Sequence, residues 1–142
     1  DLVVYRALDI LLWGSRPYTE KLFINLTKLW DGYGFYDNAV KGRENETGKI
    51  IYDVYKLALF VYLYRALEYT GSDIIYDYEH IYEKCLEIIS MAQDKEKGGI
   101  HTDYEVINGE IVITGDMNTE TTSIVVLAIY SDYPMVISSN DC

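Results

Sequence analysis

The strongest constraint on the fold of this chain is a motif that occurs twice. The stretch "LTKLWDGYGFYD" (residues 26–37) runs from an apolar, helix-like segment through an acid and two glycines to a hydrophobic residue and another Asp. A looser version, "ISMAQDKEKGGIHTDY", follows at residues 89–104. Placing Gly34 on Gly99 gives an offset of 99 − 34 = 65 residues, and placing Asp53 on Glu120 gives 120 − 53 = 67. Such close offsets indicate a diverged internal duplication of one helical unit.

Hydrophobic periodicity predicts five helices, at residues 2–13, 18–30, 50–70, 76–93 and 119–130. The first, third and fifth have apolar centres nearly all round, which is typical of buried helices, and the other two are amphipathic. A polar stretch, 38–49, separates the second and third helices. Alternating residues around Asn108-Gly109 predict one β-hairpin near residues 99–114. The length of 142 residues suits a single domain, here 1–133, followed by an irregular tail, 134–142, that starts at Pro134.

The second glycine loop, Gln93 to Ile100, resembles the glutamine-and-glycine signature of α/α-toroid proteins such as the terpenoid cyclases. The first loop, Trp30 to Phe35, matches only in its glycine half. The resemblance implies an all-α fold of antiparallel helical hairpins of α/α-toroid type, with the one β-hairpin added. Because the chain supplies too few helices for a complete toroid, it is expected to be a partial toroid within a larger protein; a small independent bundle is the alternative.

Several activities of toroid proteins lack their motifs in this sequence. There is no DxDD-type acid cluster for terpene cyclisation, no Asp/Cys/His zinc set for prenyl transfer and no thioester-type Cys-Gly-Glu-Gln. The resemblance therefore implies a carbohydrate-active domain of the glycoside hydrolase or lyase kind. The alternative is a non-catalytic structural or interaction domain of a larger extracytoplasmic assembly.

The candidate site residues follow from the repeat. Asp53 and Glu120 occupy equivalent positions near the N-terminal ends of the inner helices, and a pair of carboxylates is what glycoside chemistry requires, so these two are the predicted catalytic residues. The predicted substrate-binding residues surround them: Tyr33, Tyr36, Asp37, Tyr52, Tyr55, His101, Asp103, Tyr104 and Asn118. The competing interpretation is structural, since acids in a first helical turn stabilise the helix dipole and loop acids bind glycine amides.

Charge and composition limit the partners. The net charge of −11 and the pI near 4.4 argue against nucleic acid and anionic membrane surfaces. The apolar run 57–64 is too short to span a bilayer. We expect an oligosaccharide, another protein chain or a missing N-terminal part of a toroid as partner, with no cofactor and no metal.

Weaker signals concern the location of the protein and its cysteines. The sequons at Asn25 and Asn45, together with 15 tyrosines, favour an extracellular or cell-surface glycoprotein. Cys85 is expected to be a buried thiol. The sequence leaves open a disulfide between Cys85 and Cys142, and whether Asp1 is a mature N-terminus.

Overall fold

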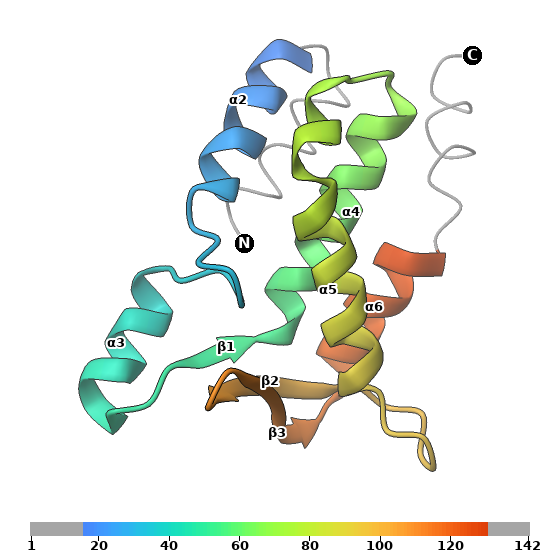
Figure 1. Cartoon of the computed structure of the whole chain (residues 1–142). Coiled ribbons are helices and arrows are strands. Elements are labelled where there is room, and N and C mark those ends of the chain that lie inside the picture. Colours follow the sequence, from blue (N-terminus) through green and yellow to red (C-terminus); the bar gives the residue numbers. More distant parts are fainter. Residues whose placement is uncertain (1–15, 131–142) are drawn as a thin grey trace.

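The computed structural model describes residues 16–130, which combine helices with a small sheet (Figure 1). The elements, in chain order, are α2 (Arg16–Thr27), α3 (Asn38–Thr47), β1 (Ile51–Asp53), α4 (Val54–Tyr69), the 3-10 helix η1 (Ile74–Tyr78), α5 (Glu79–Ala92), β2 (His101–Ile107), β3 (Glu110–Met117) and α6 (Thr119–Tyr130). The helix expected at residues 2–13 and the tail expected from residue 134 lie outside the described residues.

The expected all-α fold is wrong, because the three strands form an antiparallel sheet in the order β1-β2-β3 and the architecture is mixed α/β. The β2–β3 hairpin itself is confirmed, at 101–117, with positive φ at both Asn108 and Gly109 as a tight hairpin turn requires. The sequence did not predict strand β1, whose residues fall at the start of the helix predicted at 50–70. Its pairing is non-local, since Tyr52 lies opposite Tyr104 and stacks on that ring at 5.1 Å.

The polar stretch between the second and third predicted helices forms helix α3, which the sequence did not predict. Its boundaries follow ordinary capping rules: the carboxylate of Asp37 accepts a hydrogen bond from the amide of Val40, and Gly48 ends the helix with φ of 73°. Only Val40 of its ten residues is buried, so α3 has almost no apolar face. Prediction from hydrophobic periodicity missed it for that reason.

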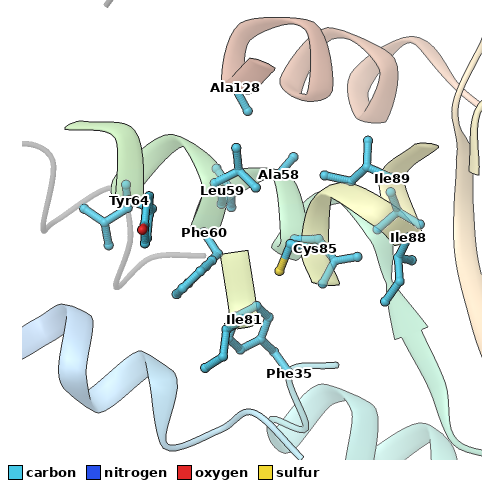
Figure 2. Packing of buried hydrophobic residues seen from close by; sticks show 14 of the residues in the cluster. Phe35, Ala58, Leu59, Phe60, Tyr64, Ile81, Cys85, Ile88, Ile89 and Ala128 are labelled. Atoms are coloured by element: carbon cyan, nitrogen blue, oxygen red, sulfur yellow. The ribbon is translucent and has the colours of Figure 1, made fainter. Parts of the chain in front are cut away.

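The core lies among α4, α5 and α6. Helix α4 packs against both α5 and α6, and nearly every residue from Val54 to Leu67 is buried, as its all-round apolar pattern predicts (Figure 2). Arg65 of α4 donates hydrogen bonds to the carbonyls of Ala128 and Ile129 and so satisfies the C-terminal end of α6. In Figure 1 the sheet lies across one end of this helical group. None of the helices in residues 16–130 has the length and apolarity needed to cross a bilayer.

The two glycine loops share one local geometry. In the first, Trp30 and Phe35 form an isolated antiparallel bridge, and Asp31 accepts hydrogen bonds from the amides two and three residues ahead. In the second, Gln93 and Ile100 form the bridge, and Asp94 accepts from the amides at the same two spacings. The repeated sequence motif thus corresponds to a repeated turn that is stabilised by its own acid.

Candidate functional site

The end of β1, the start of β2 and the N-terminus of α6 border a pocket of about 450 Å³, which we call the acidic pocket. Its lining combines three carboxylates with an aromatic ring, short polar side chains and one aliphatic residue: Asp53, Asp103, Glu120, Tyr55, Thr102, Asn118, Thr121 and Ile124. The two predicted catalytic acids therefore lie at one pocket, together with three of the predicted substrate-binding residues.

Asp53 is the most heavily ion-paired of the three acids. Although it occupies the residue before α4, its side chain makes no capping hydrogen bond. Its Oδ2 lies 2.6 Å from Nζ of Lys56 and 2.8 Å from Nη2 of Arg43. Lys56 also contacts Asp37 at 2.6 Å, and its side chain is only 8% exposed. Asp53 is thereby held between two cations rather than bonded to the helix end.

A β-bulge positions Asp103. His101 pairs with Met117 but Asp103 pairs with Thr114, so β3 carries one extra residue opposite this part of β2. The bulge contains Gly115 with φ of 77°, the backbone conformation that glycine adopts without strain. A methyl group at Gly115 would overlap the hydroxyl of Thr102 and lie 2.8 Å from Oδ2 of Asp103. The absence of a side chain there leaves room for the Asp103 carboxyl.

The Asp103 carboxyl is held towards its protonated form. Burial raises its pKa above the ordinary value for Asp, and the negative charge of Asp53 acts in the same direction. The hydroxyl of Thr102, which donates a hydrogen bond of 3.1 Å to Oδ2, opposes this rise, as does the more distant charge of Arg43. Because the net pKa shift is upward, Asp103 keeps its proton to a higher pH than a solvated Asp.

The N-terminus of α6 supplies the opposite wall. Asn118 caps the helix, since its Oδ1 accepts a hydrogen bond of 2.7 Å from the amide of Thr121. Glu120 lies in the first turn with an exposed side chain, where the helix dipole stabilises a negative charge. On the α4 side, burial and the charge of Asp53 raise the pKa of Tyr55, so its hydroxyl stays protonated and can donate.

The remaining predicted binding residues lie elsewhere. Tyr33 and Tyr52 line a second pocket of about 620 Å³ beside Asp31 and Glu105. Within that region the hydroxyl of Tyr52 donates to Asp31. Tyr104 is fully buried and donates a hydrogen bond of 2.8 Å to the carbonyl of Tyr33. These contacts connect the first glycine loop to the sheet.

Three other predicted residues have structural partners. The hydroxyl of Tyr36 donates to Glu44 of α3. His101 contacts the carbonyl of Gly115 through Nδ1 at 2.8 Å, and its Nε2 lies 3.8 Å from Asp94. Asp37 reaches the acidic pocket only indirectly, through its contact with Lys56.

Sequence reasoning missed Arg43, Lys56 and the two threonines of the acidic pocket. Lys56 did carry a signal, because a lone Lys in an otherwise apolar buried helix needs a partner carboxylate. Arg43 carried no such signal, because it lies in a stretch without hydrophobic periodicity. Only the tertiary structure places that stretch against β1.

Three further observations concern the sequons, possible metal ligands and similarity to known proteins. The sequon residues Asn25 and Asn45 both have exposed side chains, on α2 and α3. Within residues 16–130, no three His, Cys, Asp or Glu side chains are grouped to hold a metal ion. No protein-family model, curated protein or solved structure matches this chain.

Proposed function

We propose that the acidic pocket binds an oligosaccharide and catalyses cleavage of a glycosidic bond. The observation that supports this best is the meeting of three carboxylates from three elements around one pocket, with one of them, Asp103, held towards its protonated form. Glycoside cleavage needs one acid that is protonated and one that is ionised. The pocket volume of about 450 Å³ lies within the range of small-ligand sites.

The chemistry divides between Asp103 and Glu120. Asp103 gives its proton to the glycosidic oxygen as the bond between that oxygen and the anomeric carbon breaks. Glu120 either takes a proton from the water that attacks the anomeric carbon or attacks that carbon itself. In the second route water then hydrolyses the ester between the sugar and Glu120, and Asp103 takes the proton of that water. The sequence predicted Asp53 in place of Asp103, but Asp53 is occupied by Lys56 and Arg43. Its proposed role is therefore to raise the proton affinity of Asp103.

The other lining residues suit a sugar. The ring of Tyr55 offers an apolar face for the C–H side of a pyranose, while its protonated hydroxyl can donate a hydrogen bond. Asn118 and Thr102 add polar groups that can pair with sugar hydroxyls. Ile124 provides a second apolar contact.

The experiment is incubation of the full chain with a panel of neutral, amino-sugar and uronate oligosaccharides, with products detected by mass spectrometry. Asp103→Asn and Glu120→Gln are each expected to reduce turnover by about 10²- to 10⁴-fold, the usual contribution of an acid or base. Glu110→Gln and Asp116→Asn are matched controls, because these exposed acids of the hairpin do not line the acidic pocket. The proposal fails if no oligosaccharide is cleaved, or if both pocket variants retain wild-type turnover.

One observation favours a second candidate, a non-catalytic interaction domain. Helix α6 exposes apolar side chains on its outer face: Val126, Leu127 and Tyr130 are 50%, 52% and 76% exposed. Exposed apolar residues in one patch are typical of surfaces that contact another protein. This candidate predicts that the wild-type chain cleaves none of the oligosaccharides in the panel.

A further inference from the structure

A single guanidinium spans the two acids at the base of the acidic pocket. Nη2 of Arg43 lies 2.8 Å from Oδ2 of Asp53, and Nη1 lies 3.8 Å from Oδ1 of Asp103. The planar fork of an Arg can contact two carboxylates at once from a fixed geometry, which a Lys cannot do. The side chain of Arg43 is 31% exposed, so these contacts are only partly screened by solvent.

The strand register makes such a cation necessary. Asp53 and Asp103 are direct partners across the β1–β2 pair, and like charges in directly opposite positions destabilise a sheet. Lys56 neutralises part of this charge, but the carboxylates it contacts are Asp53 and Asp37. Arg43 is the cation that contacts both members of the opposed pair.

The contacts around the two acids are unequal. Asp53 has two close cations, at 2.6 and 2.8 Å, whereas Asp103 has the longer contact to Arg43, at 3.8 Å. The short contact holds Arg43 on Asp53, and the same guanidinium reaches Asp103 from there.

We propose that Arg43 is a positioning residue of the acidic pocket, whose guanidinium bridges Asp53 and Asp103 and holds the two opposed carboxyls in place. This inference rests on the proposed function for its catalytic meaning, since it explains how Asp103 is oriented as the acid. It also gives α3 a role, because a helix with one buried residue carries the side chain that orders the site. Figure 1 shows α3 beside β1, away from the helical core.

The groups that face Asp103 determine the direction of the expected change. They are Asp53 from β1, Thr102 from β2, Arg43 from α3 and, across the pocket, Glu120 from α6, with Lys56 of α4 acting through Asp53. Burial is the largest influence and raises the pKa of Asp103, whereas Arg43 lowers it. Removal of the guanidinium charge therefore raises the pKa of Asp103 further, and Asp103 stays protonated to a higher pH.

The first test follows the carboxyl groups directly. The side-chain carboxyl carbons of the aspartates are titrated by NMR in the full chain and in Arg43→Gln, Arg43→Lys and Lys41→Gln. We expect Asp103 to titrate at a higher pH than a solvated Asp in the wild type. The Asp103 midpoint should move upward in Arg43→Gln and less in Arg43→Lys, which keeps the charge. Lys41→Gln removes an exposed cation from the same helix and should leave the midpoint unchanged.

The second test uses the substrate found with the oligosaccharide panel. Arg43→Gln is expected to move the alkaline limb of the pH–rate profile upward and to lower kcat by about 10- to 100-fold through misplacement of the acids, with KM little changed. Arg43→Lys should recover the position of the limb but only part of kcat. If Arg43 had a merely structural role, its substitution would lower activity without moving the alkaline limb of the pH–rate profile.

Two results would overturn the inference. One is an Asp103 midpoint that does not move in a folded Arg43→Gln protein. The other is an Arg43→Lys protein that keeps both the wild-type Asp103 midpoint and the wild-type kcat, a result that stands even if Arg43→Gln does not fold. A shifted Asp103 midpoint in a chain that cleaves no oligosaccharide would reject the proposed function but keep the bridge by Arg43.

Discussion

At the residue scale, the site depends on a position that has no side chain. Gly115 supplies both the positive φ of the bulge and the space beside Asp103. Any other residue would need a left-handed backbone conformation, which costs about 1–2 kcal/mol for residues other than glycine, and would push the Asp103 carboxyl away. The orientation of a proposed catalytic acid is thus set from the neighbouring strand.

Gly115→Ala is expected to lower the free energy of unfolding by about 1–3 kcal/mol and to reduce turnover of any cleaved oligosaccharide. Gly42→Ala is the matched control: this glycine lies within α3, nothing would touch its added methyl group, and the change should stabilise by about 0.5–1 kcal/mol. Urea unfolding of both variants checks the prediction. Equal stability of Gly115→Ala and the wild type would contradict it.

At the element scale, α3 is attached by charge rather than by apolar contact. Asp37 begins the helix by capping Val40 and also contacts Lys56 of α4, while Arg43 extends to the strands. With so little buried apolar surface, an isolated helix of this length would be marginal in water. The ion pairs therefore position α3 against β1.

The pKa of Asp37 gives α3 a testable pH dependence. Burial alone would raise this pKa, but the contacts with Lys56 and with the Val40 amide outweigh it and lower the pKa below the ordinary value. A lowered folded-state pKa means that the ionised carboxylate stabilises the fold above about pH 4, the unfolded value, and that this stability is lost as pH falls through the folded value.

Asp37→Asn keeps an equally good cap but removes the charge, whereas Asp37→Ala removes both. We expect Asp37→Asn to be less stable than the wild type at neutral pH and equally stable once the pH is below the folded pKa of Asp37. Asp37→Ala should lose about a further 1 kcal/mol through the cap. Urea unfolding at a series of pH values measures the free energy of unfolding of the wild type and of both variants, and so gives both differences. A wild-type advantage over Asp37→Asn that persists unchanged in acid would refute this account.

At the scale of the whole molecule, one aromatic cluster joins the helical core to the first glycine loop. Phe60 of α4 packs at 5.3 Å from Phe23 of α2 and at 5.2 Å from Phe35 of the loop, measured between ring centroids, and Tyr64 is a third neighbour. Figure 2 shows Phe35, Phe60 and Tyr64 among the buried residues. Phe60 is fully buried. The cluster thus connects segments that are far apart in the sequence.

Phe60→Ala is expected to destabilise the protein by about 3–5 kcal/mol, because it removes the buried ring and leaves a cavity between three segments. Met91→Ala on α5 is the control, since this side chain is 45% exposed and the change should stay within about 0.5 kcal/mol. Calorimetry of the wild-type chain and of the two variants compares their stabilities. A Phe60→Ala protein as stable as the control would mean that the cluster is not part of the cooperative core.

What the sequence determined by itself was local. Hydrophobic periodicity predicted the buried helix α4 and the helix at 119–130, and turn chemistry predicted the hairpin at Asn108-Gly109. Both signals act between residues that are near one another in the chain. The duplicated glycine motif likewise predicted two turns, and the structure forms the same hydrogen bonds in both. The repeat also singled out Asp53 and Glu120, which line one pocket.

Tertiary structure alone decided the rest. Strand β1 exists because Tyr52 and Tyr104, which lie 104 − 52 = 52 residues apart, pair and stack, and no short-range pattern encodes that partner. The same pairing sets Asp103 opposite Asp53 and brings Arg43 between them. The proton affinity of an acid depends on its burial and on charges supplied by distant segments, so the chemical character of the pocket arises only when the chain has folded.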